Sequence, residues 1–294
     1  MDEIIDICIC TFRRPQVTET IASIAAQRLP AGIALRLVVA DNEPEPNARP
    51  AVETAAASHG LPLVYVHAPA GNISIARNAC LDAARSDWIA FIDDDESAEP
   101  DWIEKLLAHR DSAEIVFGVS RAVFDPGTPR WIVVGDFHSN RMGPRDGAHN
   151  GYTCNVLIDR RFIDRHGLRF DRALGKTGGE DTLFFDQAFA AGARFAYAPD
   201  AVVSEPIPSH RATFGWLGRR RYRSGQVDYL LRKRAGRDVR RRGAMAIGKI
   251  GYCLVRAAVA VPRREEAARH VLRGMLHVGF LASLMGRGIY EEYR

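Results

Sequence analysis

Short runs of β-branched and other apolar residues alternate along most of the chain with segments whose apolar residues recur at helical spacing. The runs that predict strands are residues 4–10, 35–40, 63–66, 88–92 and 115–119. Helical spacing begins near Pro15 and recurs at residues 73–84 and 100–108. This alternation predicts an α/β fold, a Rossmann-like and mostly parallel sheet with helices on both faces. Ligands of such folds bind at the carboxyl ends of the strands.

The later part of the chain changes character. Residues 125–151 are rich in Gly, Pro, Arg and Asn, which predicts a long irregular connection. A strand, a helix and a strand are expected next, at residues 152–158, 180–191 and 194–198. After Pro208 the pattern predicts an Arg-rich helix and two apolar helical stretches, residues 244–261 and 271–289. We therefore expect two domains, an α/β domain at residues 1–212 and a helical C-terminal region at residues 213–294.

Positive charge is concentrated at the start of that C-terminal region. Of a net charge of +4, residues 213–242 carry eleven Arg and Lys against two Asp, which is +9 locally and leaves −5 for the remainder. The partner of this segment should be anionic. The two apolar stretches contain several basic residues, whereas a membrane span needs about 20 nearly uncharged ones. They either complete a core or lie on an anionic membrane surface, and we favour the membrane.

Composition narrows the class and the compartment. A chain of 294 residues with 47% hydrophobic and 26% charged positions can bury a full core, so disorder is not expected. The N-terminus Met-Asp-Glu-Ile-Ile-Asp lacks the basic start and apolar core of a secretory signal, which favours a cytoplasmic location. The cysteines are odd in number and form no C-x-x-C pair, so buried free thiols are expected at Cys8, Cys10, Cys80, Cys154 and Cys253.

An acidic cluster follows the most apolar of the predicted strands. Residues 88–92 are followed at once by Asp93, Asp94, Asp95 and Glu96. Such acids are usually only solvated, but at a strand end that faces a crevice their repulsion is best relieved by a cation. Oxygen ligands favour Mg²⁺ or Mn²⁺ over zinc, and such an ion can bridge a diphosphate and stabilise it as a leaving group.

Other strand ends carry groups that suit a nucleotide. Asn72 opens a predicted helix whose free N–H groups can bind phosphate, and Arg77 adds a bidentate donor, although it could equally be a surface arginine. Asp41 ends the second predicted strand, and Thr11 and Arg13 follow the first. Each of them alone could be a turn or cap residue. Together they predict a phosphate- and nucleotide-binding edge.

The order of these motifs resembles glycosyltransferase family 2. The segments that carry the resemblance are residues 10–15 (Cys-Thr-Phe-Arg-Arg-Pro), 41–42 (Asp-Asn), 71–78 (Gly-Asn-Ile-Ser-Ile-Ala-Arg-Asn), 91–96 (Phe-Ile-Asp-Asp-Asp-Glu) and 179–181 (Gly-Glu-Asp). Within the family the chain is similar to bacterial exopolysaccharide glucosyltransferases of the succinoglycan type. The resemblance covers roughly residues 4–225 and implies a GT-A fold, inversion at the anomeric carbon and a UDP-sugar donor.

The resemblance also implies roles for the nucleotide-binding residues. Thr11 and Arg13 would line the nucleotide pocket, and Asp41 would accept a hydrogen bond from the base. Arg77 would lie near the base and the diphosphate. Asp93 would face the ribose.

Metal binding and catalysis are implied in the same way. Asp95 of the Asp-x-Asp element, with Asp93, would hold Mn²⁺ or Mg²⁺. His210 resembles a third metal ligand of some relatives, although a lone His is more often structural. Asp181 would be the general base, while Glu180 could simply complete a capping box at its helix start. A helix start lowers a carboxylate pKa and weakens it as a base, so burial under the acceptor is expected to offset this effect.

One departure from the family pattern concerns processivity. Residues 217–222 lack the Gln and Trp of the Gln-x-x-Arg-Trp element of processive members, which favours one sugar per encounter. The acceptor would be a glycan or a polyprenyl-diphosphate-linked oligosaccharide, reached from the inner face of the cell membrane.

Two other functional classes account for the sequence less well. A sugar nucleotidyltransferase would share the sheet and acids but needs a Gly-rich phosphate loop, and residues 8–15 contain no glycine. A nucleic-acid-binding protein would explain the Arg-rich segment but not the acidic strand end, so no nucleic-acid partner is expected.

Overall fold

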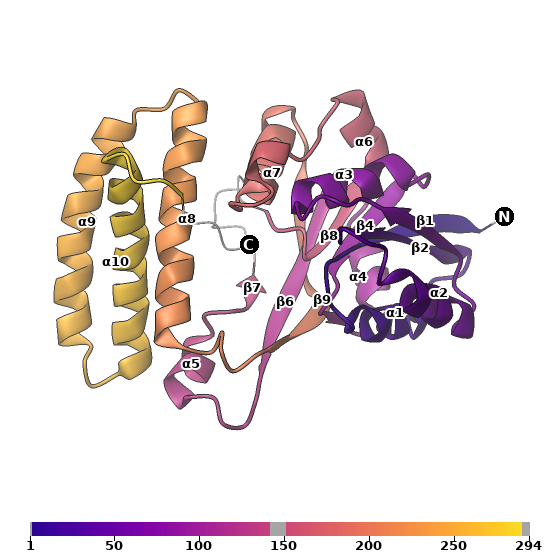
Figure 1. Ribbon diagram of the computed structural model, residues 1–294, viewed down its shortest axis with the longest axis horizontal. Helices are drawn as coiled ribbons and strands as arrows, with labels where there is room; N and C mark the ends of the chain where they lie inside the picture. The colour runs from indigo at the N-terminus through magenta and orange to yellow at the C-terminus, as the bar shows by residue number, and fades with distance from the viewer. Residues whose placement is uncertain (1, 142–150, 290–294) are drawn as a thin grey trace. The chain divides into compact units, whose positions relative to one another are not determined.

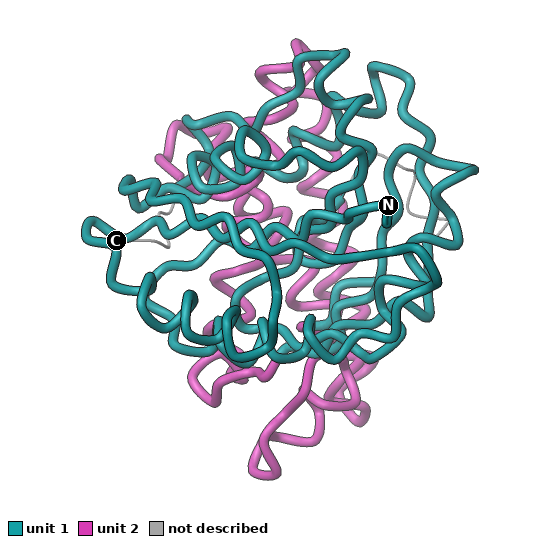
Figure 2. The backbone as a smooth tube through the Cα atoms, turned by 90° about the vertical axis from the view of Figure 1, so that its right-hand side faces the viewer, with its two compact units in different colours: residues 1–121, 139–176, 180–205 teal, residues 122–138, 177–179, 206–294 magenta. Residues whose placement is uncertain are grey.

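The computed structural model describes residues 2–141 and 151–289. The chain forms two compact units (Figure 2). Unit 1 comprises Met1–Arg121, Ser139–Lys176 and Glu180–Glu205. Unit 2 comprises Ala122–His138, Thr177–Gly179 and Pro206–Arg294.

The described residues contain one sheet of nine strands in the order β3-β2-β1-β4-β8-β6-β9-β5, with β7 beside β6. The strands are β1 (Glu3–Thr11), β2 (Ile33–Asp41), β3 (Leu63–His67), β4 (Trp88–Asp93), β5 (Ser97–Ala98), β6 (Ile115–Phe124), β7 (Asn140–Arg141), β8 (Asn155–Asp159) and β9 (Phe195–Ile207). Strands β3, β2, β1 and β4 are parallel. The pairs β4–β8, β6–β8, β6–β7 and β5–β9 are antiparallel.

Helices cover both faces of the sheet (Figure 1). The helices of unit 1 are α1 (Val17–Ala25), α2 (Arg49–Ser58), α3 (Ile73–Ala83), α4 (Trp102–Leu107), α6 (Arg160–Arg165) and α7 (Glu180–Ala190), with a 3-10 turn, η1 (Arg172–Leu174). Alternation along β1 divides the core: Ile5, Ile7 and Ile9 pack with α1, α2 and α4, whereas Cys8 packs with α3, α6 and α7. Both faces are therefore buried, as a parallel sheet requires.

Unit 2 is mainly helical. Its helices are α5 (Arg130–Gly135), α8 (Phe214–Arg234), α9 (Val239–Val259) and α10 (Arg264–Leu284), and α10 packs against both α8 and α9. Glycine permits the close approach of α8 and α10, because a Cβ at Gly225 would lie 1.8 Å from the backbone oxygen of Leu276. A Cβ at Gly279 would lie 1.9 Å from the backbone oxygen of Tyr222.

The predicted α/β class with helices on both faces is confirmed, and the helical C-terminal region is present. The prediction of an irregular connection at residues 125–151 is wrong in part, because α5 and β7 lie within this segment. Residues 142–150 lie outside the described part of the chain. Composition misled here because the apolar residues that form α5 are few and lie between Pro and Gly positions. Helices α2 and α6 were not predicted, and β9 extends well beyond the expected residue 198. The cysteines are free thiols, as expected.

Candidate active site

The parallel register brings the ends of three strands to one edge of unit 1. Thr11 at the end of β1 lies opposite Asp41 at the end of β2, and Cys10 lies opposite Asp93 at the end of β4. Thr11 and Asp41 are buried. Three residues that were predicted from separate motifs therefore end in the same part of the fold, as the carboxyl edge of a parallel sheet dictates.

The turn after β1 is held by two carboxylates. Arg13 has φ of 55°, in the left-handed region that non-glycine residues rarely adopt. Its backbone N–H donates to Glu43 Oε1 at 2.8 Å, and the N–H of Phe12 donates to Asp94 Oδ2 at 3.4 Å. These bonds offset the unfavourable backbone conformation and fix the direction in which the chain leaves the strand.

Asp41 is locked by three donors. Its Oδ2 accepts from the Tyr65 hydroxyl at 2.5 Å and from the N–H of Ala48 at 3.3 Å, while Oδ1 accepts from the N–H of Glu43 at 2.9 Å. Burial, with the bond to Asp41, raises the Tyr65 pKa, so this phenol remains a donor. Asp41 Oδ1, which accepts only one of these bonds, retains acceptor capacity for a further donor such as a base N–H.

The start of α3 is engaged within the protein. The Asn72 side chain accepts from the N–H of Ile75 at 3.3 Å and donates to the carbonyl of Arg172 at 2.9 Å. The N–H of Ile73 donates to the carbonyl of Gly175 at 3.2 Å. Asn72 therefore acts as a helix cap that ties α3 to η1, and its predicted part in nucleotide binding remains a prediction.

Arg77 points inward from α3 rather than to the surface. It is 8% exposed, and its Nη1 donates to Glu180 Oε1 at 2.6 Å. The guanidinium also lies 5.5 Å from the ring centroid of Phe170. The buried Oε2 of Glu180 has no hydrogen-bond partner in the described structure. This pair engages Glu180 and ties α3 to the start of α7, and the capping box suggested for Glu180 remains a prediction.

The acidic cluster is mostly shielded from solvent. Asp94 and Glu96 are buried, and the Glu96 carboxylate accepts from the N–H of Asp93 at 3.1 Å and from the Ser120 hydroxyl at 2.5 Å. Burial raises the pKa of Asp94 to about 7 and also raises the pKa values of Asp93 and Glu96. Burial thus disfavours the charged carboxylates, and a nearby cation would offset this cost.

A divalent cation fits this donor set. Arg14 already places positive charge on the cluster, pairing with Asp95 and lying 3.3 Å from Asp94 Oδ1. Within residues 2–141 and 151–289, no three His, Cys, Asp or Glu side chains converge on a common metal position. Unit 1 would then provide one or two carboxylates. That is the usual protein contribution to a metal ion whose remaining ligands are phosphate oxygens and water.

Asp181 has the properties of a base. It lies in the first turn of α7, and its Oδ1 accepts from the N–H of Thr182 at 2.6 Å. Burial, followed by the negative charge of Glu180, raises its pKa to about 7 against the opposing effect of Arg77. Burial within the protein therefore outweighs the helix start, which by itself would lower the pKa. A pKa near the working pH suits a general base.

His210 belongs to a different unit from the other predicted metal ligands. It is exposed and belongs to unit 2, whereas Asp93 and Asp95 belong to unit 1. Its role as a metal ligand remains a prediction.

Sequence reasoning missed Arg14, Glu43 and Tyr65. Arg14 directly follows Arg13, a predicted nucleotide-binding residue, and this position could have indicated that Arg14 belongs to the site. No sequence pattern indicated Glu43 or Tyr65, because their contacts with Arg13 and Asp41 form only in the folded chain.

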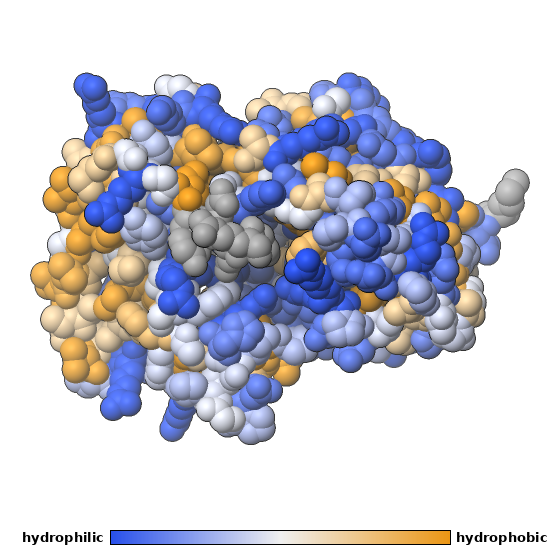
Figure 3. All heavy atoms as spheres, viewed as in Figure 1, coloured by the Kyte–Doolittle hydropathy of each residue, from blue (hydrophilic) through white to orange (hydrophobic). Residues whose placement is uncertain are grey.

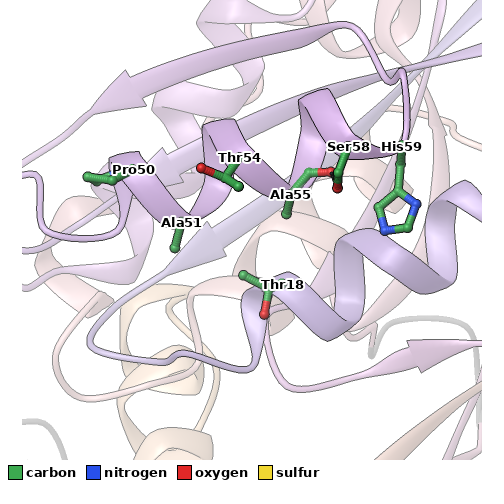
Figure 4. A pocket seen from close by; sticks show the side chains of 7 residues that line it. All are labelled: Thr18, Pro50, Ala51, Thr54, Ala55, Ser58 and His59. Carbon is green, nitrogen blue, oxygen red and sulfur yellow. Dashed lines mark hydrogen bonds between the residues drawn. The ribbon is translucent and has the colours of Figure 1, made fainter.

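A surface hollow between α1 and α2 is separate from these residues (Figure 4). Its lining consists of Thr18, Pro50, Ala51, Thr54, Ala55, Ser58 and His59. It contains none of the acids or arginines described above.

Comparison with known proteins decides the family. The profile of the family "Glycosyl transferase family 2" matches residues 6–167, which is more than half of the chain. The chain belongs to glycosyl transferase family 2. This family 2 enzyme is 42% identical over 294 residues to the succinoglycan biosynthesis protein ExoM of Rhizobium meliloti (strain 1021), covering 98% of this chain and 95% of the relative.

Solved structures support the fold of the family 2 enzyme. TarS 1–349 of S. aureus in complex with UDP-GlcNAc matches with a TM-score of 0.56 at 13% identity, over 99% of this chain and 93% of that one. The mannosyltransferase PcManGT from Pyrobaculum calidifontis, in complex with GDP-Man and Mn²⁺, matches with a TM-score of 0.57 at 16% identity. The match covers 98% of this chain and 77% of that one. The predicted GT-A fold is thereby confirmed.

Proposed function

We propose that this glycosyltransferase moves a sugar from a UDP-sugar to a hydroxyl of a glycan or lipid-linked oligosaccharide, with inversion, in surface polysaccharide synthesis. One observation carries the proposal: a single edge of unit 1 gathers Thr11, Asp41 and the acids after β4. The similarity to ExoM supports the polysaccharide pathway, and the UDP-GlcNAc complex of TarS supports the donor class. Donor binding and catalysis are assigned to residues 1–212, and membrane docking to residues 213–294.

The nucleotide would bind along the strand ends. Thr11 and Arg13 would line its pocket, and Asp41, whose orientation three donors fix, would accept from the base. Arg77 would lie by the base and the diphosphate. Asp93 would accept from the ribose. The start of α3, opened by Asn72, would contribute backbone dipoles.

Metal dependence is proposed from the acidic cluster. Asp95 and Asp93 would hold Mn²⁺ or Mg²⁺. The assignment of His210 as a third ligand remains a prediction. A divalent ion there would neutralise the diphosphate as it leaves.

Inversion needs a single base on the acceptor side. Asp181 would accept the proton of the attacking acceptor hydroxyl at its carboxylate. With a pKa raised to about 7, it can hold that proton while the new glycosidic bond forms. One base without a covalent intermediate gives inversion, because the hydroxyl attacks the face opposite the leaving diphosphate.

UDP with Mn²⁺ is expected to raise the melting temperature, on the order of 5 °C at a hundredfold excess over Kd, because ligands that bind only the folded state stabilise it. ATP with Mn²⁺ should give a smaller shift. Stabilisation by DNA or heparin but not by UDP would instead support the nucleic-acid alternative.

We also propose that unit 2 docks on an anionic membrane surface. No helix in residues 2–141 and 151–289 combines the length and apolarity needed to cross a bilayer. On α9 the small residues Gly243, Ala246 and Cys253 are buried, whereas larger apolar residues are exposed. These are Met245, Ile247, Tyr252, Leu254, Val255 and Val259, exposed by 45–73%. Figure 3 shows hydrophobic side chains gathered over α9 and α10.

Basic residues adjoin this apolar face at one end of α9. Arg240 and Arg241, both exposed, lie in its first turn, where the helix dipole disfavours positive charge. Neither side chain forms an ion pair with a described residue. Exposed Lys233 lies at the end of the preceding helix. An anionic leaflet would attract these basic side chains, while the exposed apolar face of α9 inserts into the membrane–water interface.

Flotation with liposomes tests this docking. Binding to phosphatidylglycerol vesicles is expected, with release by rising salt and little binding to neutral vesicles, because each basic residue near an anionic leaflet contributes about 1 kcal/mol before screening. The double variant Arg240→Glu, Arg241→Glu should lose binding. Arg242 is left intact because it lies against Asp228 and the Phe280 ring.

A matched control is Arg28→Glu with Arg165→Glu, the same charge change at exposed positions of unit 1. It should float like the wild type. Equal indifference of the folded wild type to both kinds of vesicle would reject docking and leave the transferase proposal intact.

A further inference from the structure

The carboxylates proposed to hold the metal already have a cation of their own. The Nη1 nitrogen of Arg14 pairs with Asp95 Oδ2 and lies 3.3 Å from Asp94 Oδ1. The Asp94 and Asp95 side chains are 8% and 18% exposed, and that of Arg14 is 31% exposed. One guanidinium nitrogen therefore faces two carboxylates in a partly desolvated place, where such attraction is stronger than at an open surface.

The backbone commits Arg14 to this position. The preceding residue, Arg13, is in the left-handed region, and its N–H is held by Glu43. Phe12 donates its N–H to Asp94, which ties the turn to the acidic cluster itself. The start of the Arg14 side chain is thus fixed beside the carboxylates by two bonds that do not involve the guanidinium.

We propose that Arg14 is a built-in counter-cation that a divalent ion must displace from Asp95, so that it weakens metal binding until the donor is present. The inference rests on the proposed metal role of Asp95. A guanidinium nitrogen and a divalent ion cannot occupy the same position on the Asp95 oxygen, and their like charges repel. Metal binding therefore requires the Arg14 guanidinium to leave.

With donor bound, the displaced guanidinium would gain the diphosphate as a new partner. Arg14 extends from the turn that carries Thr11 and Arg13, the proposed nucleotide-binding residues, and an arginine offers bidentate bonds to a diphosphate. Donor and metal would then each raise the affinity for the other. The enzyme would bind little free metal and much more metal together with the nucleotide diphosphate.

Mn²⁺ titration followed by the electron paramagnetic resonance of free Mn²⁺ tests the inference without any turnover. Donor-free Arg14→Gln is expected to bind Mn²⁺ roughly tenfold more tightly than the wild type, within the usual range of coupling between sites. UDP should tighten Mn²⁺ binding strongly in the wild type and much less in Arg14→Gln. Arg14→Lys, which keeps the charge, should resemble the wild type.

Arg165→Gln is the matched control. It removes the same charge from an exposed arginine of the same unit that lies outside the proposed site. Its donor-free Mn²⁺ affinity should stay within about twofold of the wild type. Melting curves would establish that each variant is folded.

The outcomes separate this inference from the proposed function. Equal or weaker donor-free Mn²⁺ binding by folded Arg14→Gln, with Mn²⁺ still bound by the wild type in the presence of UDP, would overturn the counter-cation role alone. Absence of Mn²⁺ binding by every variant, with and without UDP, would overturn the metal role as well. Tighter binding in Arg14→Gln that disappears when Asp95→Ala is added would support both.

Discussion

Asp181→Asn is expected to fold and bind UDP normally but to lose kcat by a factor on the order of 10² to 10⁴, the range for removal of a general base. The amide is nearly isosteric with the carboxylate, but it cannot accept the proton of the acceptor hydroxyl. The measurement is initial-rate kinetics, with UDP affinity determined in parallel. Near-normal kcat in the variant would show that another group is the base.

The pH dependence gives a second readout of the same assignment. Burial and the charge of Glu180 raise the Asp181 pKa to about 7, and only the ionised form can take a proton. The kcat/KM of the wild type should therefore fall below pH 7 and reach a plateau above it.

Glu180→Gln separates the two acids. It removes one cause of the raised Asp181 pKa, so the pH profile should move to lower pH. It also leaves the buried Arg77 without its ionised partner, which should lower the free energy of unfolding by a few kcal/mol. A profile that stays in place in Glu180→Gln would show that the titrating group is not Asp181.

Asp95→Ala is expected to abolish turnover, a loss on the order of 10³-fold or more, because a bound metal ion stabilises transition-state charge by several kcal/mol. The variant should also lose the increase in UDP affinity that Mn²⁺ gives the wild type. Binding of UDP with and without Mn²⁺ measures this effect directly, independently of the acceptor.

Asp101→Ala is a matched control for the removal of an acid. Asp101 immediately precedes α4 in the same unit, and its carboxylate pairs with Lys105 and Arg28. Its loss should cost a little stability and leave the metal effect intact. Full turnover of the wild type in EDTA would contradict the assignment of Asp95 and of the whole acidic cluster.

The parallel part of the fold and its chemistry could be read from local pattern. Each strand from β1 to β4 is a short apolar run, and the residue that follows it reaches the same edge by topology alone. The sequence alone therefore predicts that Thr11, Asp41 and Asp93 lie together, as the strand register shows.

The antiparallel part of the sheet and the side-chain pairs depend on long-range contacts that periodicity does not encode. Arg77 and Glu180 are 103 residues apart, and Asp41 meets Tyr65 only because β2 and β3 are paired. The raised pKa of Asp181 likewise follows from burial, whereas its sequence position at a helix start predicts the opposite shift. Helix α5 escaped prediction because Gly, Pro and Arg dominate the segment around it.

Release of UDP from a panel of UDP-sugars, with Mn²⁺ and with EDTA, tests the central claim most directly, since water can replace the acceptor hydroxyl as the nucleophile. The account predicts Mn²⁺-dependent release from one UDP-sugar well above the others, and loss of that release in Asp95→Ala. Release from no nucleotide sugar by folded enzyme that also fails to bind UDP, or equal release in EDTA, would contradict it.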